Sequence, residues 1–177
     1  MKNIRILLVL ILLSACGEEE VTRQPQAPLP DPSKQSLLKA NQFLPQKDQE
    51  KIETFIQRKG WDMQKNASGV YEQIFRDPKN NKKKVSKGNT VHYAYKIFLL
   101  DGTLCYSSDQ SGLASLKVGE AGKETALEEV ILRMHKGEKA RIIIPPYRAH
   151  GLIGDMKKIP ARSSVIYEIE LTEIIDF

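Results

Sequence analysis

The chain has 177 residues, of which 41% are hydrophobic and 28% charged, with a formal net charge of +5 at pH 7. This length suffices for one modest domain with its own core, and the mild charge gives little support to nucleic-acid binding. Two cysteines and three histidines lack the short spacing of zinc ligands, which argues against a zinc site. We expect no metal, no cofactor and no nucleic-acid partner.

The first fifteen residues have the pattern of a secretory signal. Two cations flank the start of a ten-residue apolar run, residues 4–13, which is shorter than the roughly 20 residues that a membrane span needs. The run ends at Leu13-Ser14-Ala15-Cys16, which resembles a bacterial lipobox. We therefore expect removal of residues 1–15, lipidation of Cys16 and a net charge of +3. The alternative, a buried N-terminal segment with an ordinary core cysteine, fits the flanking charges less well.

Residues 16–36 are expected to form a lipidated tether. Three glutamates open this segment and four prolines follow in it. It offers few apolar side chains to offset the entropy of ordering, and its prolines favour an extended conformation of about 3.1 Å per residue.

Residues 37–66 are expected to form a helical arm. Ile52, Phe55 and Ile56 fall at helical spacing, Asp48 is a candidate N-cap, and Gly60 is a typical residue just after a helix end. The arm could pair two copies into a dimer or pack onto the domain that follows, and both alternatives remain open.

Residues 67–177 predict an α+β domain, in which an antiparallel twisted sheet of five to six strands wraps over one short helix. Alternation and turn signals place strands at 69–75, 90–100, 103–107, 139–144 and 165–174. The helix spans 125–134, and its Leu127, Ile131 and Met134 should face the sheet. A long loop at 145–164 precedes the last strand, and loops of this length usually have a function.

Short motifs in this domain follow one another in a known order. In chain order they are Val91-His92-Tyr93, Asp101-Gly102, Ser107-Ser108, Val118-Gly119, Glu128-Glu129, Met134, Gly137-Glu138-Lys139-Ala140, Pro145-Pro146, Ala149-His150-Gly151, Ile159-Pro160 and Val165 to Leu171. The series resembles the FK506-binding-protein (FKBP) family of peptidyl-prolyl cis-trans isomerases. The resemblance implies the FKBP-like fold and rotation about X-Pro amides, a reaction that needs no nucleophile, metal or proton carrier.

The resemblance implies a substrate pocket in which four positions keep their role. Tyr93 stands at the pocket-wall tyrosine, Tyr167 at a pocket phenylalanine, and Ile159 at the apolar residue before the loop proline. Glu124 stands where a backbone N–H binds the substrate carbonyl. Tyr93 and Tyr167 lie on predicted strands, so each could instead belong to the core.

Four further pocket positions depart from the family pattern. Leu127 replaces the tryptophan of the pocket floor, and His150 replaces a tyrosine whose hydroxyl donates to the substrate. Cys105 replaces a phenylalanine, and Tyr106 replaces the neighbouring aspartate. Asp155 falls where the tip of the loop approaches the ligand. These changes predict weak isomerase activity. Cys105 is alternatively expected to be a small buried hydrophobic residue of the core.

The sequence as a whole predicts a lipid-anchored isomerase that helps proline-containing exported polypeptides to fold. Arg58-Lys59-Gly60-Trp61 and the Gly-Asp-x-x-x-Ile-Pro pattern at 154–160 are similar to the gliding-motility-associated lipoprotein isomerases of Bacteroidota. The expected location is the outer membrane of the cell envelope, with the periplasmic side preferred over the surface. In that group the acidic residues after the lipidated cysteine would favour display on the outer surface, so this alternative stays open. The alternative is a non-catalytic FKBP-like interaction module of an envelope secretion or gliding-motility assembly.

Overall fold

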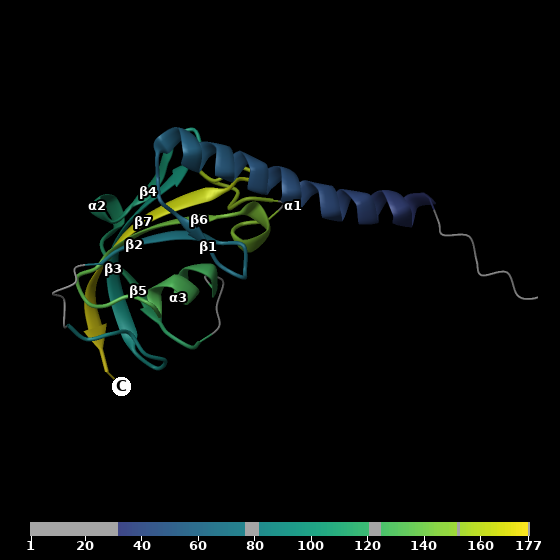
Figure 1. Ribbon diagram of the computed structural model, residues 1–177. Helices are drawn as coiled ribbons and strands as arrows, with labels where there is room; N and C mark the ends of the chain where they lie inside the picture. The colour runs from purple at the N-terminus through teal and green to yellow at the C-terminus, as the bar shows by residue number, and fades with distance from the viewer. Residues whose placement is uncertain (1–31, 77–81, 121–124, 152, 177) are drawn as a thin grey trace, which may run out of the picture. The chain divides into compact units, whose positions relative to one another are not determined.

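The computed structural model describes residues 32–76, 82–120, 125–151 and 153–176 (Figure 1). Residues 36–177 form one compact unit, which holds the whole sheet. The predicted signal peptide, Cys16 and Glu124 lie outside the described residues. In chain order the elements are α1 (Pro32–Lys59), β1 (Gln64–Lys65), β2 (Tyr71–Phe75), β3 (Thr90–Leu99), β4 (Leu104–Ser107), α2 (Ser108–Ser111), β5 (Ala114–Lys117), α3 (Thr125–Ile131), β6 (Lys139–Ile144), the 3₁₀ turn η1 (Pro146–Arg148) and β7 (Val165–Ile175).

The strands form one antiparallel sheet in the order β1-β2-β6-β7-β3-β4, and β5 also pairs with β3. The predicted α+β class and antiparallel sheet are confirmed. The described sheet has seven strands where five to six were expected. Strand β1 has two residues and β5 has four, and such short segments show too little alternation to be recognised in a sequence.

Helix α3 covers one face of the sheet. Leu127, Val130, Ile131 and Met134 are at most 1% exposed and pack with strand residues in the main core, which confirms the predicted inward face. The regular helix ends at Ile131. The next turn is tighter, because the Met134 N–H donates to the Ile131 carbonyl three residues earlier.

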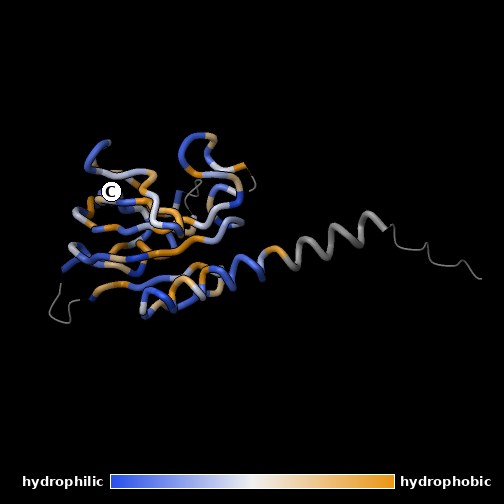
Figure 2. The backbone as a smooth tube through the Cα atoms, turned by 90° about the horizontal axis from the view of Figure 1, so that it is seen from above, coloured by the Kyte–Doolittle hydropathy of each residue, from blue (hydrophilic) through white to orange (hydrophobic). Residues whose placement is uncertain are grey.

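Helix α1 packs on the opposite face. Ile143 joins Ile52 and Phe55 of α1 in a second hydrophobic cluster, whereas its neighbours Ile142 and Ile144 belong to the core around α3. Successive strand residues point to opposite faces, so the sheet is apolar on both sides. Figure 2 shows hydrophobic stretches along the strands and intermittently on α1. The described arm thus packs locally on the domain, as one of the two alternatives predicted.

The prediction that Asp48 caps a helix is wrong. Helix α1 begins at Pro32, upstream of the expected residue 37, and continues through Pro45. Asp48 lies inside the helix, is 6% exposed and accepts a hydrogen bond from Arg162 at 2.9 Å. A capping aspartate and a buried one are indistinguishable in sequence when the partner lies 114 residues away.

Among the described residues, no helix has the combined length and apolar character needed to cross a bilayer.

Candidate functional site

A pocket of about 440 Å³ opens between α3, the end of β6, β7 and the long loop 145–164. It is lined by Ala126, Leu127, Ile144, Arg148, Ala149, His150, Gly154 and Tyr167. Three of these, Leu127, His150 and Tyr167, were predicted as pocket residues from the sequence. The structure therefore brings together side chains from helix α3, strands β6 and β7 and the long loop, which are far apart in the chain.

The floor of the pocket is apolar. Leu127 is 1% exposed, Ile144 4% and Tyr167 7%. Helix α3 presents Leu127 because this residue lies on the buried face of the helix, while β6 and β7 present Ile144 and Tyr167 from adjacent strands. Tyr167 was predicted to belong either to the pocket or to the core. Its side chain is buried and also lines the cavity.

The rim of the pocket is polar and is braced by hydrogen bonds. Arg148 in η1 donates to the Glu129 carboxylate at 2.6 Å, and the Ser68 hydroxyl donates to the same carboxylate at 2.6 Å. These bonds tie the start of the long loop to α3 and to the segment before β2. His150 lies on the same rim, so the tyrosine that the family resemblance implies there is replaced by an imidazole at the cavity itself.

Three predicted pocket residues lie in the core instead of lining the cavity. Tyr93 is 3% exposed, Cys105 1% and Ile159 2%, and all three belong to the main hydrophobic cluster. Burial raises the pKa of the Cys105 thiol above its ordinary value, so this thiol stays neutral and poorly nucleophilic at neutral pH. The expectation that it acts as a small buried hydrophobe agrees with this placement.

Tyr106 binds the tip of the loop. Its hydroxyl donates to the Asp155 carboxylate, which also accepts from the backbone N–H groups of Lys157 at 2.9 Å and Ile159 at 2.8 Å. Burial opposes ionisation of Asp155, but these hydrogen bonds outweigh it and lower the pKa of Asp155 from 3.8 to about 2. The hydrogen bond to Asp155 raises the pKa of Tyr106. The two side chains together fasten the loop to β4.

The loop crosses itself closely at Gly154. This residue lines the pocket and has φ +68°, and a Cβ atom added there would lie 2.2 Å from the Ile159 carbonyl oxygen. The neighbouring Asp155 N–H donates to the same oxygen at 3.1 Å. Only glycine fits such a crossing without strain. The sequence motif Gly-Asp-x-x-x-Ile-Pro was the available signal for this wall of the pocket, although Gly154 was not named as a site residue.

The arrangement is suited to binding rather than to covalent chemistry. The described lining residues contribute apolar side chains, one guanidinium, one imidazole and the phenol of Tyr167. Among residues 32–76, 82–120, 125–151 and 153–176, no cluster of histidine, cysteine, aspartate and glutamate could hold a metal ion. The cavity can take an apolar ring and separate a bound amide from water.

The surrounding sequence matches a known family. Residues 81–172, more than half of the chain, match the sequence model described as FKBP-type peptidyl-prolyl cis-trans isomerase. The chain belongs to this FKBP-type family. The match covers the described strands from β3 to β6, all of α3 and most of β7, and so includes every lining residue of the pocket.

Individual FKBP-type relatives match over the same region. The chain is 36% identical over 90 residues to the Bos taurus peptidyl-prolyl cis-trans isomerase FKBP10, which covers 48% of this chain and 14% of that protein. It is 33% identical over 88 residues to the Bos taurus isomerase FKBP11, covering 50% of this chain and 43% of that protein. The chain thus spans less than half the length of these two relatives.

Two solved structures share the FKBP-like fold. FkpA from Escherichia coli superposes with a TM-score of 0.61 at 24% identity, over 81% of this chain and 65% of that one. The N-terminal domain of FKBP42 from Arabidopsis thaliana superposes with a TM-score of 0.57 at 21% identity, over 65% of this chain and 93% of that one. At these identities the likeness establishes the fold alone.

Proposed function

We propose that the chain is a peptidyl-prolyl cis-trans isomerase that acts on X-Pro bonds of polypeptides in the pocket beside α3. The observation that carries the proposal is the apolar floor formed by Leu127, Ile144 and Tyr167 in a cavity of about 440 Å³. A proline ring is apolar and compact, so such a floor can bind it while the amide lies at the rim.

The proposed mechanism is selective binding of the twisted amide. Rotation about the peptide bond has a barrier of about 18–20 kcal/mol, because the planar form is stabilised by resonance. A twisted amide loses that resonance and is less polar than the planar form, so a cavity that excludes water favours it. Any interaction that is stronger with the twisted than with the planar amide lowers the barrier by the difference.

The proposed activity is weak. Leucine at the floor offers less apolar contact than the tryptophan implied by the family resemblance, a loss of about 1–2 kcal/mol at roughly 25 cal/mol per Å². At His150 an imidazole takes the place of the tyrosine hydroxyl, and exchanging one neutral hydrogen bond costs about 0.5–1.5 kcal/mol. The role predicted for the backbone N–H of Glu124 falls outside the described residues and remains part of the proposal.

Refolding of a protein limited by X-Pro isomerisation tests the activity, because the uncatalysed step takes tens to hundreds of seconds. Residues 36–177, the compact unit, should accelerate it. Ala149→Phe puts a ring into the pocket and should abolish catalysis, whereas Ala161→Phe makes the same change at an exposed residue that does not line the pocket and should not. Equal activity of the two variants would refute the assignment of the pocket.

A second function is a non-catalytic interaction module of an envelope secretion or gliding-motility assembly. The placement of Tyr93 and Ile159 in the core and the engagement of Tyr106 with Asp155 favour it, because fewer side chains are left to contact substrate. Tight binding of a native partner without catalysis by wild type would select this function over the isomerase.

We further propose that the chain is an exported lipoprotein, anchored through Cys16 to the outer membrane on its periplasmic side. The lipobox-like Leu13-Ser14-Ala15-Cys16 and the similarity to Bacteroidota lipoprotein isomerases support this. Its clients would then be proline-containing exported polypeptides. Cys16→Ser should leave the precursor unprocessed or release the protein from membranes. Mature Cys16→Ser protein that still partitions to membranes would refute the anchor.

A further inference from the structure

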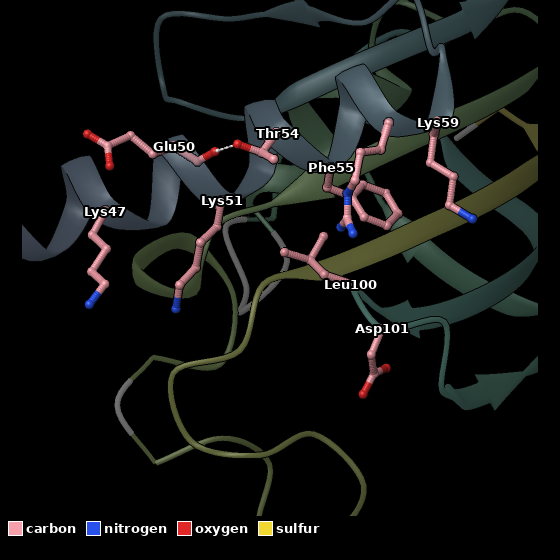
Figure 3. Close-up of a pocket in the computed structure, with 9 residues that line it drawn as sticks. Lys47, Glu50, Lys51, Thr54, Phe55, Lys59, Leu100 and Asp101 are labelled. Atoms are coloured by element: carbon pink, nitrogen blue, oxygen red, sulfur yellow. Dashed lines mark hydrogen bonds between the residues drawn. The ribbon is translucent and has the colours of Figure 1, made fainter.

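A second concavity, separate from the isomerase pocket, lies between α1 and the turn that joins β3 to β4 (Figure 3). It is an open groove of about 930 Å³ lined by Lys47, Glu50, Lys51, Thr54, Phe55, Arg58, Lys59, Leu100 and Asp101. None of these residues lines the pocket beside α3. Because α1 supplies one wall and the hairpin turn the other, the groove exists only when the helix is packed on the sheet.

The helix wall is held firmly in place. Ile52 is fully buried and Phe55 is 4% exposed, both in the second hydrophobic cluster. The Tyr71 hydroxyl donates to the Glu53 carboxylate at 2.8 Å, and Asp48 pairs with Arg162 at 2.9 Å. These contacts fix α1 to β2 and to the long loop, so the groove is preformed and a ligand need not order it.

The groove is basic over an apolar floor. Lys47, Lys51 and Arg58 recur along α1 at spacings of four and seven residues, which return them to one side of a helix, and Lys59 follows Arg58. Figure 3 shows Lys47 and Lys51 extending toward the Leu100 side of α1 while Glu50 points away from it. The apolar lining residues are Leu100, on the turn wall, and Phe55, on the helix wall, which is 4% exposed and has Arg58 and Lys59 over its ring.

The cations of this groove have few anionic partners. None of the ion pairs among the described residues involves Lys47, Lys51, Arg58 or Lys59. Asp101 is the carboxylate on the opposite wall, and it accepts a hydrogen bond from the Thr103 N–H at 2.9 Å within its own turn. The groove therefore presents a surplus of positive charge.

We propose that this groove binds an extended, acidic polypeptide segment that carries apolar side chains. Carboxylates of the segment would pair with the lysines of α1, and its apolar side chains would lie against Leu100, which is only partly buried, and the small exposed part of Phe55. A concave shape with an apolar floor fits a peptide better than the flat headgroup plane of an anionic membrane. The proposal rests on the proposed function only in taking the segment to be part of a client polypeptide.

The test uses the full chain and a fluorescent, proline-free peptide. Every third residue of this peptide is leucine, and the residues between the leucines are glutamates. Without proline, the peptide does not probe the isomerase pocket. Fluorescence anisotropy at about 0.05 M salt should show binding, which weakens at about 0.5 M salt as the charges are screened. A peptide with lysine in place of glutamate should not bind.

Three variants locate the site. Lys47→Glu with Lys51→Glu should weaken binding at least tenfold, whereas Lys84→Glu with Lys87→Glu makes the same change of charge at exposed residues outside the groove and should leave it within about twofold. Asp101→Asn keeps the oxygen that accepts from Thr103 and removes a negative charge, so it should strengthen binding. Isomerase activity in the refolding assay should be the same in all three variants.

The outcomes separate the alternatives. Equal weakening by the two lysine pairs would overturn the groove as the site and leave only a general charge effect. The protein could instead fail to bind the acidic peptide but sediment with phosphatidylglycerol vesicles, with sedimentation lost in the Lys47→Glu, Lys51→Glu variant. This result would refute a peptide as the ligand and identify the groove as a membrane-binding surface. Peptide binding without isomerase activity would refute the proposed function and leave the groove intact.

Discussion

Replacing Gly154 by alanine should damage the candidate pocket more than any other single methyl group added to its loop. The new Cβ atom would lie 2.2 Å from the Ile159 carbonyl oxygen and 2.7 Å from the Pro160 carbonyl carbon. The first distance is about 1.2 Å inside ordinary contact, and both neighbours are backbone atoms. No side-chain rotation can relieve this contact, so the loop must move.

The matched control is Gly151→Ala in the same loop. Gly151 has φ +63°, close to the +68° of Gly154, but nothing lies within 4 Å of its added Cβ. The left-handed backbone conformation destabilises the folded state by about 1–2 kcal/mol when the residue is alanine. Alanine also lowers the conformational entropy of the unfolded chain, which stabilises the fold by about 0.4–1 kcal/mol. Gly151→Ala should therefore lower the free energy of unfolding by about 1 kcal/mol.

Gly154→Ala adds two terms to this backbone strain. Overpacking against backbone costs about 1–3 kcal/mol, and displacement of Ile159 weakens the hydrogen bond from the Asp155 N–H, at about 0.5–1.5 kcal/mol. The loss should exceed that of Gly151→Ala by at least about 1.5 kcal/mol in urea unfolding. Since a shift of 1 Å can cost about a hundredfold in rate, catalysis of proline-limited refolding should fall by that order. Equal stability and activity of the two variants would refute the crossing geometry.

Three other predictions concern the floor, the arm and the loop tip. Leu127→Trp together with His150→Tyr should raise the isomerase rate by more than about tenfold in proline-limited refolding, and no increase would count against this pocket. Asp48→Asn should lower the free energy of urea unfolding by about 1–2 kcal/mol, because its ion pair to the loop is only partly buried; an unchanged midpoint would contradict this. Because the pKa of Asp155 falls from 3.8 to about 2 on folding, its ionised form stabilises the fold above about pH 4, and this contribution is lost as the pH falls toward 2. The thermal midpoint of Tyr106→Phe should therefore lie below that of wild type at neutral pH, and the two midpoints should converge as the pH falls from about 4 to about 2. A difference between the midpoints that does not change with pH would refute the hydrogen bond from Tyr106 to Asp155.

Much of the fold could be predicted because its signals are local. Alternation in β2, β3, β6 and β7 and the Asp101-Gly102 turn need only neighbouring residues to be recognised. The inward face of α3 follows from spacings of three and four residues. Three short segments, β1, β5 and α2, escaped prediction because they are defined by their packing partners and not by their own pattern. The four-residue β4 could be predicted because it follows the Asp101-Gly102 turn.

The candidate site could be predicted only in part. A resemblance transfers residue positions, and Leu127, His150 and Tyr167 line the pocket. It does not transfer side-chain direction, so Tyr93 and Ile159, which the resemblance also implied, belong to the core beside the cavity.

The sequence by itself determined the strand and helix periods, which depend on residue types at fixed local spacing, and the family, which rests on motifs along residues 81–172. Only the tertiary structure decided the partners of the polar groups. Tyr106 meets Asp155 across 49 residues, and Asp48 meets Arg162 across 114. Such pairs leave no periodic trace in the chain, because their geometry is set by how α1 and the long loop pack on the sheet. The same packing creates the basic groove along α1, whose two walls come from segments that show no relation in sequence.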